Sequence, residues 1–419
     1  MSQRSLQQWL THIESFHPEE IELGLERINL VAEKLDVKQQ QAKVIIVGGT
    51  NGKGSVVAAL EALARINHLA VACYTSPHLI RFNERIRIDG DDVSDEQLVT
   101  AFEKIELVRQ SLNVALTFFE FTTLAALWIV KFQYPQTALL VLEVGLGGRL
   151  DAVNLVSSNV SVITTVAKDH TAWLGSTLFE IATEKAGIIK HNCQALIGDQ
   201  PTFDLVRQVC HIKESQYQQL QLVSTPNEQE QLQIDNSQFN PFQLLAQNVM
   251  LAKQAFELLF ADKNSSLSDF LPKIKIQGRF QRISNGITTL VDVAHNPQAV
   301  TRLLSQLNLS RQSGELPAGR IFAICGMMAD KAIAEVLQVL DPFIHQWIFC
   351  DLNLPRAISS KDLYALYVKH HMQERANRAQ SVAEAYQMVL TQADKNDLVL
   401  VFGSFITVAD MIKYFSKVE

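Results

Sequence analysis

The stretch that decides the fold is Val44-Ile45-Ile46-Val47-Gly48-Gly49-Thr50-Asn51-Gly52-Lys53-Gly54-Ser55. An apolar run enters a glycine-rich turn, and a lysine, a hydroxyl group and a helical pattern from Val56 to Asn67 follow. This order predicts a strand, a phosphate-binding loop and a helix. Glycines let backbone N–H groups approach a phosphate closely, and the N-terminus of a helix adds partial positive charge.

The spacing inside this loop departs from the usual G-x-x-x-x-G-K-[ST] pattern. Gly48 and Gly52 enclose three residues, and Gly54 separates Lys53 from Ser55. Lys53 is in position to reach the β- and γ-phosphates of a nucleotide, and Ser55 to bind Mg²⁺. The whole pattern after an apolar strand predicts nucleoside triphosphate binding; a purely structural turn is the alternative.

Length and composition indicate a globular enzyme. A chain of 419 residues is expected to form two or three domains. Hydrophobic residues make up 47% and charged residues 19%, which suits a large core, and the net charge of −7 argues against general nucleic-acid binding. The five cysteines show no metal-ligand spacing, and no signal peptide or bilayer-spanning run is visible. We therefore expect a cytoplasmic protein with free thiols and no membrane partner.

Strand and helix patterns alternate along the rest of the chain. Thr137–Val144 is a near-continuous apolar run, typical of a central parallel strand, with Glu143 close to its end. The alternation predicts an α/β fold with two domains. The first, residues 1–283, is expected to hold a doubly wound parallel sheet, and the second, residues 284–419, to be a smaller Rossmann-like α/β domain. Strands of the second domain are expected at Thr288–Val293, Ile321–Gly326, Gln346–Cys350 and Leu398–Gly403.

Polar side chains stand where several expected strands end, which is the edge at which open α/β sheets bind ligands. Ser76 follows the strand Ala70–Tyr74, Glu143 ends its own strand, and His170 follows Val160–Val166. A buried carboxylate needs a cation or a shifted pKa, so a metal is one interpretation for Glu143. The alternatives are a turn serine, a buried salt bridge and a structural histidine.

Six motifs in one order resemble one family: folylpolyglutamate synthase, which in its bacterial form is also a dihydrofolate synthase, within the Mur ligase superfamily. The resemblance covers nearly the whole chain. The motifs are Gly49–Ser55, Thr75–Leu79, Glu143–Ala152, Asp169-His170 with Leu174-Gly175 and Thr177, Glu184–Ile188, and Asp292–Pro297.

The resemblance implies ATP-dependent amide formation. A substrate carboxylate would attack the γ-phosphate of ATP to give an acyl phosphate, and the amine of L-glutamate would then displace phosphate. Dihydropteroate as acceptor gives dihydrofolate, and a folate with a glutamate tail gives a tail longer by one residue. The family also implies two Mg²⁺ sites, small-molecule substrates only, and a monomer.

The family's site residues carry over to matching positions. They imply Lys53, His170 and Lys185 as catalytic residues, and Ser55, Ser76, Glu143, His170 and a carbamylated Lys185 as metal ligands. ATP would be bound by Asn51, Gly52, Lys53, Gly54, Ser55, Asn248, Arg279, Asp292 and His295. The folate would be bound by Phe119, Glu120, Arg149, Asp151 and Ala152, and the segment Leu23–Arg27 also resembles this site.

Several of these positions have plain alternatives. Lys185 would ordinarily be a lysine on a helix surface, Asn248 a helix asparagine that points to water, and Arg279 a linker arginine in a surface pair. The aromatic residues near Glu120 are equally suited to the core. One position departs from the family: Ile406 stands where some bifunctional bacterial relatives carry histidine.

Three functions compete at this stage. The leading one is the bifunctional ligase, with a folylpolyglutamate synthase that lacks the dihydrofolate activity as a variant. Another Mur-type ligase is the nearest rival, although the phosphate loop begins at Gly48 and leaves little chain for a UDP-sugar domain before it. A regulatory module that only hydrolyses ATP is the third, and Glu143, His170 and Lys185 on catalytic positions argue against it.

Overall fold

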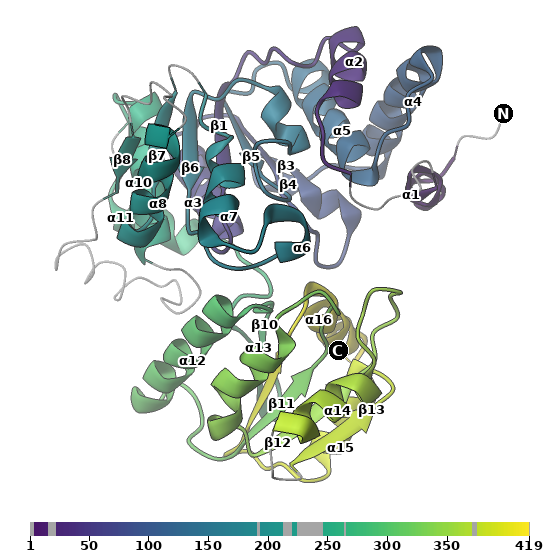
Figure 1. The fold of residues 1–419 in the computed structure, drawn as a ribbon, viewed down its shortest axis with the longest axis vertical. Helices are drawn as coiled ribbons and strands as arrows, with labels where there is room; N and C mark the ends of the chain where they lie inside the picture. Colours follow the sequence, from purple (N-terminus) through teal and green to yellow (C-terminus); the bar gives the residue numbers. More distant parts are fainter. Residues whose placement is uncertain are drawn as a thin grey trace. The chain divides into compact units, whose positions relative to one another are not determined.

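A computed structural model describes residues 4–15, 22–190, 193–212, 220–223, 246–263, 265–370 and 375–418. The chain divides into two compact units (Figure 1). Unit 1 comprises residues 1–167 and 174–275, and unit 2 comprises residues 168–173 and 276–419. Each unit is built around its own sheet, so the expected two-domain α/β fold is confirmed.

The sheet of unit 1 has the strand order β4-β3-β2-β5-β1-β6-β7-β8. The six strands β2, β5, β1, β6, β7 and β8 run parallel to one another. At one edge of the sheet, β3 pairs antiparallel with β2, and β4 pairs antiparallel with β3. Their bounds are β1 (Lys43–Gly48), β2 (Val71–Tyr74), β3 (Ile86–Ile88), β4 (Asp91–Asp92), β5 (Leu139–Glu143), β6 (Val160–Ile163), β7 (Gln194–Ile197) and β8 (Leu220–Leu222).

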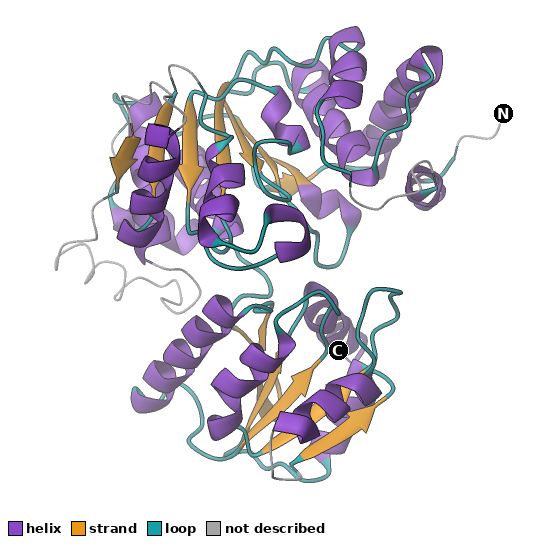
Figure 2. Ribbon diagram, in the orientation of Figure 1, coloured by secondary structure: helices purple, strands orange, loops and turns teal. Residues whose placement is uncertain are grey.

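The centre of this sheet is fully apolar. Every residue of β5 is buried, and β5 pairs in parallel with β1 on one side and β2 on the other, as a continuous run of Leu and Val requires. Helices cover both faces of the sheet (Figure 2). They are α1 (Leu6–Glu14), α2 (Glu26–Lys34), α3 (Lys53–Ile66), α4 (Asp95–Leu112), α5 (Phe118–Gln133), α7 (Leu178–Ala186), α8 (Gln200–Ile212), α10 (Ala246–Leu259) and α11 (Leu267–Phe270).

The sheet of unit 2 has the strand order β13-β12-β11-β14-β10-β9, parallel except for the edge strand β9. The strands are β9 (Gln281–Asn285), β10 (Ile287–Asp292), β11 (Ile321–Cys325), β12 (Gln346–Cys350), β13 (Ala376–Ala379) and β14 (Leu398–Phe402). The helices are α12 (Pro297–Gln312), α13 (Ile333–Leu340), α14 (Ser360–His370), α15 (Val382–Leu390) and α16 (Phe405–Val418), with α6 (Thr171–Leu174) beginning in the short segment 168–173.

The boundary between the units differs from the expected one. The structure places it between Lys275 and Ile276, whereas the sequence predicted it after residue 283. The reason is that Gln281–Asn285 is not a linker but forms β9, which pairs antiparallel with β10. The backbone N–H of Val293 also donates to the carbonyl of Gly278, so the chain before β9 is tied to unit 2 as well.

Other elements differ only in detail. β7, α8, β9 and β13 were among the elements not predicted, and most of the polar region 212–238 lies outside the described residues. None of the helices in the described ranges is long and apolar enough to cross a membrane.

Candidate active site

The phosphate loop joins β1 to α3, and its geometry requires glycine at two positions. Gly49 has φ +137° and Gly52 has φ +93°. A Cβ on Gly49 would lie 1.8 Å from Thr164 Oγ1, and a Cβ on Gly52 would lie 2.7 Å from Asn248 Nδ2. The hydroxyl of Thr164 donates to the carbonyl of Asn51 at 2.6 Å, which ties the loop to the end of β6. The loop is therefore held close to its neighbours on two sides.

Lys53 and Ser55 lie on the first turn of α3. The ammonium group of Lys53 donates to the carbonyls of Gly49 at 3.0 Å and Thr50 at 3.4 Å, so the side chain curls over the loop. Ser55 is buried. This first turn carries no acidic side chain, so its free N–H groups and Lys53 together favour an anion.

Glu143 and Ser76 stand beside this loop. Glu143 ends β5 and pairs with Val47 of β1, and its side chain is only 6% exposed. One carboxylate oxygen accepts the backbone N–H of Ser76 at 3.3 Å. A Cβ on Gly54 would lie 3.9 Å and 4.0 Å from the two carboxylate oxygens of Glu143. The ends of three neighbouring strands, β2, β5 and β1, thus bring Ser76 and Glu143 together beside the turn that carries Ser55.

This donor set fits a hard divalent cation. Mg²⁺ takes one or two carboxylates and completes its shell with hydroxyls, water and substrate phosphates. Glu143 supplies the carboxylate, and Ser55 and Ser76 supply hydroxyls. Among the residues that the structure describes, no group of three or more His, Cys, Asp and Glu side chains gathers as a metal cage.

The glycine-rich loop after β5 packs against the start of α5. A Cβ on Gly145 would lie 2.6 Å from Cζ of Phe119, so the aromatic ring occupies the space that a side chain would need. Asp151 is buried and accepts the N–H groups of Leu146 at 2.9 Å and Val153 at 3.0 Å. Burial raises the pKa of Asp151 to about 6, against the lowering effect of these N–H donors. The loop thus brings Phe119 and Asp151 into one region, next to the buried Ala152.

Glu120 is buried at the N-terminus of α5, where it forms a capping box with Thr117. It accepts the N–H of Thr117 at 2.8 Å, the hydroxyl of Thr117 at 3.0 Å and Nε of Arg27 at 3.1 Å, all on one carboxylate oxygen. The other oxygen is buried without a hydrogen-bond partner in the described parts of the chain. That oxygen is a candidate acceptor for a substrate donor.

Lys185 lies on α7, below the same loop. The alternative of a surface lysine is wrong, because Lys185 is 4% exposed. A Cβ on Gly148 would lie 2.8 Å from the carbonyl of Glu184 and 3.0 Å from that of Lys185, so the loop approaches the helix backbone closely. Arg149 is exposed and pairs with Glu184 at 2.8 Å.

Asn248 lies on α10 and faces the phosphate loop. It is 3% exposed, which excludes the alternative that its side chain points to water. Its Nδ2 atom is buried and has no hydrogen-bond partner within the described ranges. A buried amide donor beside Gly52 is the arrangement expected for a group that completes its hydrogen bonds on a ligand.

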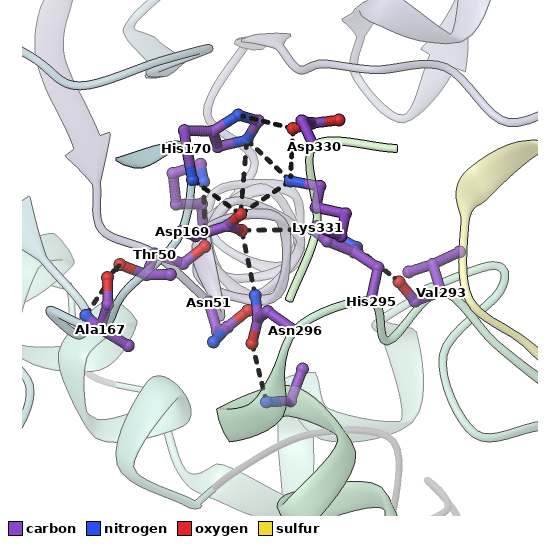
Figure 3. Close-up of polar contacts among 12 residues, drawn as sticks. Thr50, Asn51, Ala167, Asp169, His170, Val293, His295, Asn296, Asp330 and Lys331 are labelled. Atoms are coloured by element: carbon purple, nitrogen blue, oxygen red, sulfur yellow. Dashed lines mark hydrogen bonds and ion pairs between the residues drawn. The ribbon is translucent and has the colours of Figure 1, made fainter. Parts of the chain in front are cut away.

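Unit 2 holds a second group of charged side chains (Figure 3). Asp169 accepts from Nζ of Lys331 at 2.7 Å and from Nδ2 of Asn296 at 3.1 Å, and Nε2 of His295 lies 3.4 Å from it. Nζ of Lys331 also lies 3.2 Å from Nε2 of His170. These contacts explain why residues 168–173 belong to unit 2, although the chain on both sides belongs to unit 1.

The charges of this group follow from its burial. Burial alone would raise the pKa of Asp169, but the hydrogen bond from His295 and the charge of Lys331 hold it well below its usual range. Burial and the charge of Lys331 lower the pKa of His170 to about 4. His170 is therefore neutral near pH 7, the state in which a ring nitrogen accepts a hydrogen bond or binds a metal.

The remaining predicted ATP residues lie close by in unit 2. Asp292 is buried at the end of β10 and accepts the N–H groups of Phe280 and Ala294, both at 2.8 Å. The guanidinium of Arg279 lies 5.9 Å from the ring centre of Phe405. The ring centre of His295 lies 6.4 Å from the same ring centre of Phe405. Arg279 and His295 thus both lie near the ring of Phe405.

The structure divides the predicted metal ligands. Ser55, Ser76 and Glu143 lie together in unit 1, Lys185 lies in the same unit, and His170 belongs to unit 2. Sequence reasoning missed Lys331, Asn296 and Phe405, as well as Asp330 and Arg302, whose Nε atom is buried. A signal for Lys331 existed, since Asp330-Lys331 follow an apolar strand and Gly326, as other site residues follow theirs.

Comparisons with known proteins agree with the two-unit α/β fold. Residues 278–405 match the family described as Mur ligase, glutamate ligase domain. A dihydrofolate synthase/folylpolyglutamate synthase of Haemophilus influenzae is 37% identical over 97% of this chain and 96% of its own, and one of Escherichia coli is 33% identical over 97% and 95%. Escherichia coli FolC in complex with DHPP and ADP superposes with a TM-score of 0.86 at 32% identity, covering 99% of this chain and 98% of its own. A bifunctional folylpolyglutamate synthase/dihydrofolate synthase with Mn, AMPPNP and L-glutamate bound has a TM-score of 0.82 at 32% identity and the same coverage.

Proposed function

This chain belongs to the dihydrofolate synthase/folylpolyglutamate synthase family of Mur-type ligases, and on that premise we propose how its residues carry out the reaction. It is an ATP-dependent ligase that attaches glutamate in folate metabolism. The acceptors we propose are dihydropteroate, which gives dihydrofolate, and folates that already carry a glutamate tail. The cosubstrate is ATP, and the divalent metal we propose is Mg²⁺.

The reaction proceeds in two steps. The acceptor carboxylate attacks the γ-phosphorus of ATP, the bond to ADP breaks, and an acyl phosphate forms. The uncharged amine of L-glutamate then attacks the acyl carbon, phosphate leaves, and the amine nitrogen loses a proton. Lys53 and the N–H groups at the start of α3 hold the phosphates and stabilise the charge that develops on them. Arg279 and His295 add positive and hydrogen-bonding groups for the nucleotide, and Asn248 donates to the base.

Two metal positions are proposed. Ser55, Ser76 and Glu143 would hold one Mg²⁺, and His170 and a carbamylated Lys185 would contribute to the second. Bound there, Mg²⁺ neutralises phosphate charge during the transfer. The observation that supports a modified Lys185 is its burial, because a buried ammonium is costly and a neutral amine reacts with CO₂.

The acceptor site is proposed on the loop Gly145–Ala152 and the start of α5. Phe119 offers a ring face to a pterin, the free oxygen of Glu120 accepts from one of its N–H groups, and Asp151 holds the loop in shape. Arg149 is exposed on the same loop and suits an anionic part of the acceptor.

The observation that carries the proposal is the gathering of Ser55, Ser76 and Glu143 at three neighbouring strand ends, beside Lys53. The test is glutamate-dependent release of ADP, measured with dihydropteroate and separately with tetrahydrofolate. We expect release with both acceptors, and loss of it in Glu143→Gln. Release with tetrahydrofolate alone would reduce the function to polyglutamylation, and release with neither would refute the folate assignment.

Carbamylation of Lys185 has its own test. Protein equilibrated with ¹³C-bicarbonate should show one carbamate signal in its carbon NMR spectrum, and Lys185→Gln should lack that signal. Lys190→Gln is the matched control, since Lys190 is also partly buried and donates to the carbonyl of Asn154 at 3.0 Å. A signal that persists in Lys185→Gln would place the modification elsewhere.

A further inference from the structure

Lys331 is a buried cation at the point where unit 2 holds the segment 168–173. Its side chain is 7% exposed. The ammonium group lies 2.7 Å from Oδ1 of Asp169, 3.2 Å from Nε2 of His170 and 3.7 Å from Oδ2 of Asp330 (Figure 3). Three acceptors thus surround one buried positive charge, and together they offset the cost of burying it.

The contact with His170 assigns the proton on its ring. An ammonium group donates hydrogen bonds and has no lone pair, so Nε2 of His170 must be the acceptor. The ring proton then lies on Nδ1, on the side of Asp330, whose Oδ2 is 3.8 Å from that nitrogen. A ring nitrogen has one lone pair, and Lys331 uses the one on Nε2.

We propose that Lys331 is a positioning residue that occupies Nε2 of His170 in the ligand-free protein and has to leave it before this nitrogen binds a divalent metal. This inference rests on the proposed role of His170 as a metal ligand. A metal and an ammonium group cannot share one lone pair, so the two cations compete for His170. The same residue holds Asp169 and fixes the segment that carries His170 on unit 2.

The segment has other anchors that do not depend on Lys331. Asn296 donates to Oδ2 of Asp169 at 3.1 Å, and Nε2 of His295 lies 3.4 Å from the same oxygen. Asp169 also accepts the backbone N–H of His170 at 2.9 Å. Removing the ammonium group of Lys331 therefore leaves the segment held by two further contacts of Asp169, while the lone pair of His170 becomes available.

The test follows the imidazole of His170 by NMR in the full chain labelled with ¹⁵N-histidine, with Mn²⁺ alone as the probe. The signals of His170 are identified by their absence in His170→Ala, and their paramagnetic broadening is titrated with Mn²⁺. Lys331→Met should shift the titration to about tenfold lower Mn²⁺, because a hydrogen bond to a charged group no longer competes. Lys361→Met, at an exposed lysine of the same unit, should titrate as the unaltered protein does.

The outcomes separate the inference from the function on which it rests. If His170 broadens in the unaltered protein but Lys331→Met needs equal or more Mn²⁺, Lys331 supports metal binding and the competition is refuted. If Mn²⁺ never broadens His170 in any variant, the metal role of His170 itself fails, and the inference with it. Lys331→Arg keeps the charge and should titrate like the unaltered protein, which makes it the check if Lys331→Met folds poorly.

Discussion

The phosphate loop of unit 1 and the Asp169 group of unit 2 are both polar sites that follow strands, but they are held in different ways. The Asp169 group consists of Asp169, His170, His295, Asn296 and Lys331. The loop depends on backbone: Gly49 and Gly52 adopt positive φ, and a Cβ on either would collide with a neighbour. The Asp169 group depends on side-chain charge, with Lys331 and Asp169 in a pair that is mostly buried. We therefore expect added atoms to destabilise the phosphate loop, and the loss of one charge to destabilise the Asp169 group.

This difference also decides how each site responds to a ligand. N–H groups at a helix start are oriented by the helix and stay in place when a phosphate arrives. A lysine ammonium on a flexible stem changes partners with a rotation of its side chain. The loop is thus a fixed receptor, whereas the Asp169 group can rearrange.

Loss of Lys53 gives the largest effect expected from the loop. Lys53→Met should lower kcat for glutamate-dependent ADP release by about a thousandfold, since removal of one donor that stabilises transition-state charge costs that much. The thermal unfolding temperature should change little, because the side chain donates only to carbonyls of its own loop in the contacts that the structure gives. A variant with near-normal kcat would mean that the backbone alone holds the phosphates.

Loss of charge gives the largest effect expected in unit 2. Among the described residues, Asp169→Asn leaves the buried ammonium group of Lys331 with the half-exposed Asp330 as its one acidic partner, so the free energy of unfolding should fall by about 3–5 kcal/mol. Urea unfolding measures it, and the matched control is Asp204→Asn, whose pair with Arg207 is exposed and should matter little.

A double variant sharpens this prediction. Asp169→Asn combined with Lys331→Met removes both charges and should recover most of the lost stability, because no unpaired ammonium group remains. If the two losses simply add, the pair is not coupled, and the charge-based description of unit 2 is wrong.

Asp151 tests whether unit 1 also contains a costly charge. Its pKa is raised to about 6 by burial, so the folded state holds the proton more tightly than the unfolded state does. Stability from this group is present below pH 4 and is lost as pH rises through about 6. The stability of the unaltered protein relative to Asp151→Asn should thus fall by about 3 kcal/mol between pH 4 and pH 7 in urea unfolding. A difference that stays constant with pH would contradict the prediction.

Most of unit 1 could be predicted from the sequence because its signals are contiguous. The apolar run before Glu143 identifies a central strand, and the glycine pattern before Lys53 identifies the loop. The short edge strands β9 and β13 were missed, since a strand of four or five mixed residues carries little periodicity. The burial of Lys185 was implied only by resemblance, because a lysine at one helix position does not reveal what covers it.

The Asp169 group could not be assembled from the sequence for a different reason. Asp169 and Lys331 are 162 residues apart, and their contact depends on how two separate stretches fold onto unit 2. No local pattern marks such a pair. The segment 168–173 looks like an ordinary loop of the first domain, and only its contacts with Asn296 and Lys331 assign it to the second.

An added methyl group tests the geometric side of the comparison. Gly52→Ala should lower the free energy of unfolding by about 2 kcal/mol, since it adds left-handed strain and a contact with Asn248 at 2.7 Å. Gly314→Ala is the control: its φ is also positive, at +79°, but nothing lies within 4 Å of its Cβ, so it should lose only about 1 kcal/mol. Equal losses would show that strain alone, and not close packing, makes glycine necessary in the loop.

The smallest effect concerns Arg302, a partly buried arginine of unit 2. Arg302 has a buried Nε atom with no hydrogen-bond partner in the described ranges, and burial lowers the pKa of its guanidinium to about 10. Both oxygens of the nearby Asp292 accept backbone N–H groups instead. Arg302→Met should therefore raise the free energy of unfolding by about 1 kcal/mol, because an apolar side chain of similar length removes a buried donor without a hydrogen bond and a charge that burial disfavours. The measurement is urea unfolding beside Arg207→Met, an exposed arginine whose loss should change little. A loss of stability in Arg302→Met would contradict the prediction. It would show that the guanidinium of Arg302 stabilises unit 2, as the ammonium group of Lys331 does.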